Sequence, residues 1–175
     1  MNAPRILVAG IGNIFHGDDA FGVEVIWRLS GGPMSSKAHI VDFGIRSFDL
    51  AFALIDGYDV TILVDAVRQG GSPGTLYLIE PDLENLDDPN GQPAEMDAHS
   101  MNPVRVLQMA KRMGARFGQI LILGCEPETF GPEGEGQMSL TPIVEQAVEP
   151  AAARIRELIS EVLTREPVNV TACAI

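Results

Sequence analysis

Three short, predominantly apolar runs are the feature that most limits how this chain can fold. They occupy residues 5–10 (RILVAG), 59–67 (DVTILVDAV) and 119–125 (QILILGC). Strands that are apolar on both sides are buried on both faces of a sheet, and such sheets are mostly parallel and covered by helices. Segments with apolar residues at helical spacing alternate with these runs, at residues 19–30, 47–58, 102–114 and 141–166. We therefore expect an α/β sandwich built on a mostly parallel sheet.

Two further segments complete the predicted sheet. Residues 38–43 (AHIVDF) are expected to form its second strand in chain order. Residues 75–80 (TLYLIE) follow the third strand closely, and we expect them to run antiparallel to it, because a parallel return needs about a dozen residues or more. The chain has 175 residues, 46% of them hydrophobic, which suits one domain spanning residues 1–175.

The first strand leads into a glycine turn, residues 10–22 (GIGNIFHGDDAFG), that begins like a dinucleotide-binding fingerprint. However, Phe15 occupies the third glycine position, and Asp18 and Asp19 stand at the start of the next helix. At an effective dielectric constant of about 20, two like charges about 4 Å apart cost roughly 4 kcal/mol, whereas a helix N-terminus stabilises an anion by only ~0.3–2 kcal/mol. The turn is therefore predicted to receive a cation rather than a phosphate.

The two adjacent acids of this turn have different expected roles. Aspartate is a common N-cap residue, and a single acid at such a place is more often a cap than a ligand. We expect Asp18 to cap the helix that follows and Asp19 to be the functional carboxylate.

Acidic residues stand at the carboxyl ends of the predicted strands, where open α/β sheets bind their ligands: Asp19, Asp42 and Asp65. Asp65 interrupts an apolar run, and an unpaired buried carboxylate is costly, so we interpret it as functional. For Asp42, a functional and a structural role both remain open. His99 ends a long acidic connection, residues 81–100, which can bring it to the same edge. Two carboxylates and one imidazole form an incomplete shell for a divalent ion such as Zn, Ni, Fe or Mn.

Charge and cysteine content argue against several other classes of protein. A net charge of −12 and a pI near 4.5 disfavour binding to nucleic acid or anionic membranes and suit basic or cationic partners. Cys125 and Cys173 are far apart, which argues against a disulfide framework and a zinc knuckle. No run reaches the ~20 apolar residues of a membrane span, and the N-terminus lacks a signal-peptide pattern, so we expect a cytoplasmic protein.

Four blocks of the sequence resemble the hydrogenase maturation proteases. They are ILVAGIGNIFHGDDAFGVEV, ILVDAV, HSMNPVRVL, and LILGCEPE followed by LTPIVEQAVEP, in that order. The resemblance implies a three-layer α/β/α sandwich around a five-stranded, mostly parallel twisted sheet with one antiparallel strand. It also implies an endopeptidase that removes the C-terminal extension of a nickel–iron hydrogenase large-subunit precursor after nickel has been inserted, cutting after a basic residue.

The same resemblance implies roles for individual residues. It places metal contacts on Asp19, Asp65 and His99. We expect Asp19 and Asp65 to be the catalytic acids of an aspartic-type endopeptidase. The expected metal is nickel brought by the substrate, for which zinc or cadmium can substitute. Such a site would act as a test of readiness, because only a nickel-loaded precursor completes the coordination shell.

Asp42 and Gly44 fall at the position that the resemblance assigns to substrate binding. The family usually has two glycines and then Thr or Ser after this acid, so Phe43 and Ile45 are departures from its pattern. The role of this loop therefore stays open.

The chemistry and the class of activity leave alternatives. The metal can polarise the scissile carbonyl or activate water, or a carboxylate can act as general base while the metal positions the chain. The sequence has no GxSxG elbow and Cys125 has no evident His partner, which disfavours covalent catalysis. The alternative function is a non-catalytic protein that binds or delivers nickel. A small-molecule enzyme on a Rossmann-like fold is a third possibility, which the double acid disfavours.

Overall fold

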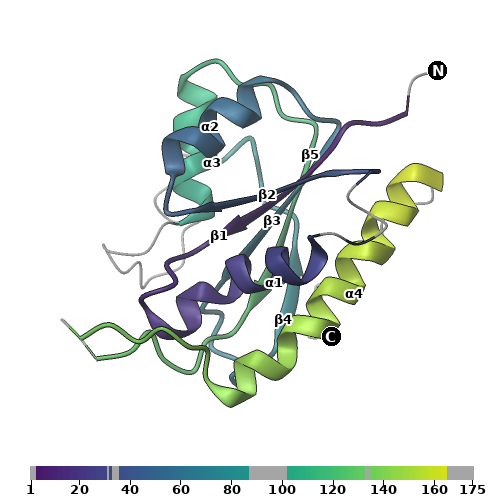
Figure 1. The fold of residues 1–175 in the computed structure, drawn as a ribbon. Coiled ribbons are helices and arrows are strands. Elements are labelled where there is room, and N and C mark those ends of the chain that lie inside the picture. Colours follow the sequence, from purple (N-terminus) through teal and green to yellow (C-terminus); the bar gives the residue numbers. More distant parts are fainter. Residues whose placement is uncertain (1–2, 31, 33–35, 87–101, 133–134, 165–175) are drawn as a thin grey trace.

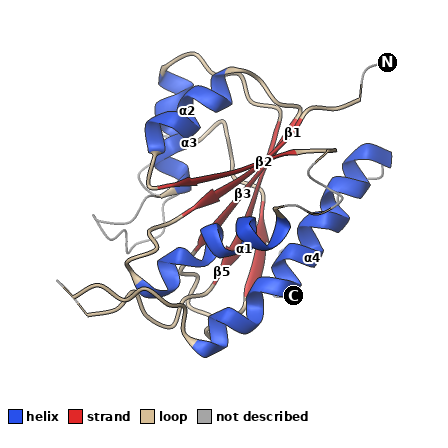
Figure 2. Cartoon of the chain, in the orientation of Figure 1, coloured by secondary structure: helices blue, strands red, loops and turns tan. Residues whose placement is uncertain are grey.

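One sheet with helices on both faces forms the framework of the computed structural model, which describes residues 3–30, 32, 36–86, 102–132 and 135–164 (Figure 1, Figure 2). The described strands are β1 (Ile6–Ile11), β2 (His39–Gly44), β3 (Val60–Ala66), β4 (Leu76–Ile79) and β5 (Gln119–Cys125). The described helices are the short 3-10 helix η1 (Gly17–Ala20), α1 (Phe21–Leu29), α2 (Ser47–Ile55), α3 (Pro103–Arg112) and α4 (Pro142–Thr164).

The strands lie in the order β2-β1-β3-β5-β4. β1 pairs in parallel with β2 and β3, and β3 pairs in parallel with β5, whereas β4 pairs antiparallel with β5. β4 runs antiparallel to β3, as predicted, but β5 lies between the two strands. β5 is buried along nearly its whole length and takes the inner place, while β4 alternates between buried and half-buried residues, as suits an edge strand.

Different helix pairs cover the two faces of the sheet (Figure 1). α1 and α4 pack against each other and against the face that carries Ile6, Val8 and Val64. α2 and α3 pack against each other and against the opposite face, which carries Leu7 and Ala9. The alternation along β1 follows from the two-residue period of a strand. This arrangement confirms the predicted three-layer sandwich with a five-stranded, mostly parallel sheet.

The parallel strands bring distant parts of the sequence to one edge. In the register of the sheet, Gly10 of β1 pairs with Asp42 of β2 and with Val64 of β3, and Asp65 pairs with Gly124 of β5. The carboxyl ends of these strands therefore meet at the turn that leads into η1. In the described part of the chain, none of the helices has the length and apolar character needed to cross a membrane.

Candidate active site

The glycines of the first turn allow backbone segments to approach closely. Gly12 has φ of +137°, and a Cβ built there would lie 1.8 Å from the carbonyl oxygen of Asp19. A Cβ on Gly22 would lie 2.1 Å from the carbonyl oxygen of Val64 and 2.3 Å from that of Ile11. α1 thus begins directly on the ends of β1 and β3. The glycines are required by this packing, which sets Asp19 beside the end of β3.

Asp19 and Asp65 form a buried pair of carboxylates at this edge. Each is only 4% exposed, although both belong to a residue type that is seldom buried without a partner. The backbone N–H of Asn13 donates to Asp19 Oδ2 at 2.9 Å, and the N–H of Ala66 donates to Asp65 Oδ1 at 2.8 Å. Burial and, to a smaller extent, the negative charge of Asp19 raise the pKa of Asp65 well above its ordinary value, and the Ala66 N–H lowers it only in part.

A positive charge would relieve the repulsion within this pair. Two neighbouring carboxylates in a poorly solvated place disfavour double ionisation, and a cation between them restores it. The third predicted metal contact, His99, lies outside the described residues, so its place in this site stays a prediction. Within the described ranges, no three His, Cys, Asp or Glu side chains are grouped so that they could hold a metal ion.

Asp42 and Gly44 reach the same edge from β2. Asp42 lies two strands from β3, about 10 Å at the strand spacing of a sheet, and its carboxylate accepts a hydrogen bond of 3.2 Å from Trp27 Nε1 on α1. Gly44 has φ of +54°, and its carbonyl accepts a hydrogen bond of 3.0 Å from the N–H of Gly12. The structure thus places Gly44 against the glycine turn and engages the Asp42 side chain with α1.

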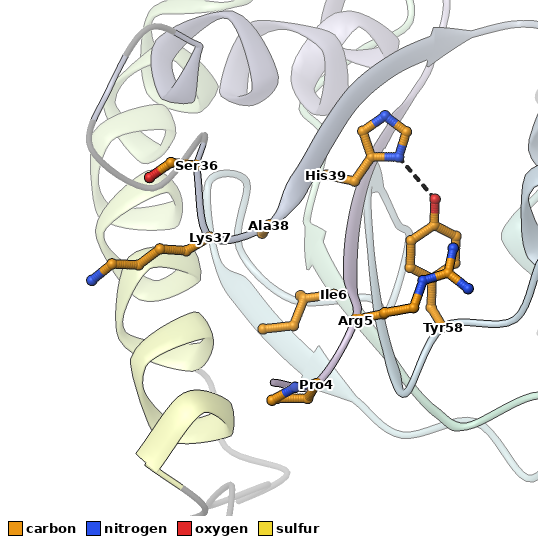
Figure 3. Close-up of a pocket in the computed structure, with 8 residues that line it drawn as sticks. All are labelled: Pro4, Arg5, Ile6, Ser36, Lys37, Ala38, His39 and Tyr58. Atoms are coloured by element: carbon orange, nitrogen blue, oxygen red, sulfur yellow. Dashed lines mark hydrogen bonds between the residues drawn. The ribbon is translucent and has the colours of Figure 1, made fainter. Parts of the chain in front are cut away.

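The described pocket lies at the other end of the sheet (Figure 3). It has a volume of about 290 Å³ and is lined by residues of the amino ends of β1 and β2, among them Arg5 and His39. His39 Nδ1 and the Tyr58 hydroxyl are 2.8 Å apart, and the Arg5 guanidinium lies 4.9 Å from the centre of the Tyr58 ring. None of the predicted site residues that the structure describes lines it.

A comparison with protein families matches residues 23–158 of this chain to the model described as hydrogenase maturation protease. The chain belongs to the hydrogenase maturation protease family. Its members named below are proteases or proteins of hydrogenase expression and formation. Membership confirms the resemblance read from the four sequence blocks, and it shows that the chain is a peptidase.

Relatives in this family are similar over most of the chain. It is 31% identical over 159 residues to the hydrogenase expression/formation protein HupD of Rhizobium leguminosarum, covering 88% of this chain and 75% of that protein. The crystal structure of a hydrogenase 2 maturation peptidase from a member of the Thaumarchaeota matches with a TM-score of 0.66 and 31% identity, covering 89% of this chain and 98% of the other. The hydrogenase maturating endopeptidase HybD of Escherichia coli matches with a TM-score of 0.71 and 26% identity, covering 90% and 93%.

In this hydrogenase maturation protease, Asp18 has a different role from the predicted one. Neither η1 nor α1 has a side-chain cap, so the expectation that Asp18 caps the following helix is wrong. Its carboxylate is fully buried and accepts hydrogen bonds from Glu128 N (2.8 Å), Thr129 N (3.1 Å), Thr141 N (2.7 Å) and Thr141 Oγ1 (3.0 Å). Because Thr141 directly precedes α4, Asp18 stabilises the start of that helix instead.

Another buried acid, Glu126, was not predicted from the sequence. It follows β5 and accepts hydrogen bonds from Gln69 N (2.8 Å), Gly71 N (3.2 Å) and Tyr77 Oη (2.9 Å). It therefore fixes the turn between β3 and β4. Its signal in the sequence is its place directly after an apolar strand, which is the signal that identified Asp65.

Proposed function

We propose that this protein is the endopeptidase that removes the C-terminal extension of a nickel–iron hydrogenase large-subunit precursor once nickel has been inserted. Family membership supports the general partner, a hydrogenase large-subunit precursor. The observation that carries the finer proposal is the buried pair Asp19 and Asp65, which leaves negative charge at the carboxyl edge of the sheet.

The donor set at this edge fits nickel carried by the substrate. Two carboxylates offer oxygen ligands to a divalent ion, and in our proposal His99 adds an imidazole, which suits nickel and zinc. Such a set is too small to fill a coordination shell and leaves positions for groups of the precursor. The protein therefore tests for nickel, because an empty precursor does not neutralise the two acids. Zinc or cadmium can occupy the same ligands.

The residues of the chain have separate roles in this proposal. Asp19 and Asp65 hold the metal-loaded end of the precursor and act as the catalytic acids. A carboxylate whose pKa is raised accepts a proton closer to neutral pH than an ordinary one, which suits Asp65 to act as a general base toward water. When bound, a divalent ion can polarise the scissile carbonyl or activate water. Asp42 and Gly44 line the path of the extension beside the end of β2.

A cleavage assay tests this function. A nickel-loaded precursor and a nickel-free one are incubated with the wild-type protein and with Asp19→Asn, Asp65→Asn and His99→Ala. We expect cleavage of the loaded precursor only, and a loss of about 10²–10⁴-fold in each variant. Glu149→Gln is the matched control, because Glu149 is an exposed acid on α4 that pairs with Arg28 and Arg156.

Two outcomes decide against the proposal. Equal cleavage of the loaded and the nickel-free precursor would show that the protein does not recognise nickel before it cleaves. Nickel binding without cleavage of any precursor would instead support the alternative, a protein that binds or delivers nickel without catalysis.

A further inference from the structure

Asp18 joins three parts of the chain that are distant in sequence. Its Oδ1 accepts from the backbone N–H and the hydroxyl of Thr141, and its Oδ2 accepts from the backbone N–H groups of Glu128 and Thr129 and from the Thr141 hydroxyl. Both oxygens are thus used by donors that belong to the loop after β5 and to the start of α4. No positive side chain is needed, since N–H dipoles and hydroxyls carry the stabilisation.

The backbone around Asp18 is fastened to the same loop. The N–H of Gly17 donates to the carbonyl of Gln137 at 2.7 Å, and the N–H of Asp18 donates to the carbonyl of Thr129 at 3.1 Å. Gly17 has φ of +55°, and a Cβ there would lie 3.0 Å from the Thr129 carbonyl oxygen, so the two segments are in close contact. η1 is therefore held along its first two residues by the loop that follows β5.

Asp19 is the next residue of this short helix. Its N–H donates to the carbonyl of His16 at 3.1 Å, and its carboxylate accepts from the N–H of Asn13 at 2.9 Å. A four-residue 3-10 helix has little internal stability, so its position depends on what it is attached to. The attachment at Asp18 fixes where the adjacent carboxylate points.

We propose that Asp18 is a positioning residue, which holds η1 against the loop after β5 and the start of α4 and thereby sets the Asp19 carboxylate beside Asp65. The catalytic consequence rests on the proposed function, whereas the positioning itself does not. Asp18 acts only through Asp19 and makes no contact with the substrate.

Asp18→Asn is the sharpest probe because asparagine has the shape of aspartate but accepts at one oxygen only. Its NH₂ group would face N–H or hydroxyl donors in a fully buried place, and an unmatched donor there is costly. Thr141→Val is a milder probe, since it removes the hydroxyl donor and leaves the Thr141 backbone N–H in place. It serves if Asp18→Asn does not fold.

The matched control is Glu126→Gln. Glu126 is also a buried acid, 5% exposed, that accepts from backbone N–H groups of a neighbouring turn, but that turn joins β3 to β4 and does not include η1. The control therefore loosens a similar clamp between the start of the loop after β5 and the β3–β4 turn, and it leaves the contacts of Asp18 in place. It separates a local effect on Asp19 from a general loss of stability.

Amide hydrogen exchange in the metal-free protein reports on the position of Asp19 and does not depend on a cleavage assay. The reporter is the amide of Asn13, which donates to the Asp19 carboxylate, and the reference is the set of β3 amides. We expect Asn13 to exchange on the order of 10-fold faster relative to β3 in Asp18→Asn, less so in Thr141→Val, and unchanged in Glu126→Gln. If Asn13 and β3 change in the same proportion in Asp18→Asn, the proposal is overturned.

Cleavage kinetics supply the second readout. With a nickel-loaded precursor, we expect Asp18→Asn to lower kcat by about 10²-fold with little change in KM, because a small misplacement of a catalytic group slows the chemical step. Glu126→Gln should retain the wild-type kcat. Equal losses in the two variants would overturn the positioning role. If the wild-type protein cleaves no precursor, the proposed function fails while the exchange experiment still decides the position of Asp19.

Discussion

Asp18 and Asp65 are buried carboxylates at the same edge of the sheet, and their surroundings are opposite. Asp18 is 0% exposed and accepts from two hydroxyl or N–H donors at Oδ1 and three at Oδ2. Asp65 is 4% exposed, accepts from the N–H of Ala66, and faces the negative charge of Asp19. One carboxylate is saturated with donors, and the other lies beside a like charge.

This difference separates a structural acid, Asp18, from the acid to which we assign a function in our proposal, Asp65. A carboxylate surrounded by N–H and hydroxyl donors is stable as an anion and has no capacity left for a ligand. A carboxylate that is desolvated and repelled by a neighbour is unstable as an anion until a proton or a cation arrives. The two acids therefore differ in their capacity to bind a proton or a cation because of their donors, although both are buried.

The largest expected effect is a difference in the free energy of unfolding between Asp18→Asn and Asp65→Asn. Asp18→Asn should lower the free energy of unfolding by about 3 kcal/mol, because buried donors lose a charged acceptor. Asp65→Asn should leave it unchanged within about 1 kcal/mol or raise it, because a disfavoured buried charge is removed. Urea denaturation of the metal-free proteins at pH 7 measures both. Equal losses in the two variants would erase the distinction.

Gly22→Ala disturbs the acidic pair through the backbone. Its methyl group would lie 2.1 Å from the Val64 carbonyl oxygen and 2.3 Å from that of Ile11, and neither strand end can move freely. We expect a loss of about 2 kcal/mol in the free energy of unfolding, even though alanine favours a helix by about 1 kcal/mol over glycine. Gly136→Ala is a useful control, since Gly136 is not among the glycines with positive φ and its added Cβ would meet only the Phe15 carbonyl oxygen, at an ordinary contact distance of 3.6 Å. A stable Gly22→Ala protein with normal cleavage would contradict the close contact.

The free energy of unfolding should depend on pH because the pKa of Asp65 is raised in the folded protein. The pKa of Asp65 is raised above the value of 3.8 expected in an unfolded chain, so the folded protein keeps its proton when the unfolded chain has lost it. The protonated Asp65 therefore contributes its full share to the free energy of unfolding below about pH 4. As the pH rises, this contribution falls by about 1.4 kcal/mol per pH unit, until the pH passes the pKa of Asp65 in the folded protein. Asp65→Asn should lack this slope in denaturation curves of metal-free protein. If the free energy of unfolding changes with pH in the same way in the wild type and the variant, the pKa of Asp65 is not raised in the folded protein.

The smallest expected effect concerns Cys125, which lies at the end of β5 near Asp18. Burial, followed by the negative charges of Asp18 and Glu126, raises the pKa of its thiol to about 12. The thiol should therefore stay protonated and unreactive at pH 8 in the folded protein. Alkylation of a Cys173→Ser variant, followed by mass spectrometry, checks this, with urea-unfolded protein as the positive control. Rapid alkylation of the folded protein would contradict this and would support Cys125 as a nucleophile.

Much of the framework can be predicted from the sequence because its signals are local. The apolar runs at residues 5–10, 59–67 and 119–125 become β1, β3 and β5, and parallel strands end at one edge, which brings Asp19 and Asp65 together. The neighbour of β4 is not predictable in the same way. Which strand is inserted beside β3 depends on a segment that lies much later in the chain.

The role of Asp18 is beyond local sequence reasoning for a similar reason. Its backbone donors come from residues that lie 110, 111 and 123 positions away. A pattern of neighbouring residues identifies an acid at a helix start, but it does not identify which helix that acid stabilises. The part of His99 in the site, and the nickel that we propose there, remain predictions for experiment.

Side-chain carboxyl resonances of labelled aspartates, followed during addition of cadmium to the metal-free protein, test the central claim most directly. We expect the resonances of Asp19 and Asp65 to shift together and to saturate, while the resonance of Asp18 stays in place because its oxygens already accept hydrogen bonds. A shift of Asp18 equal to that of Asp65, or no shift of Asp65, would contradict it.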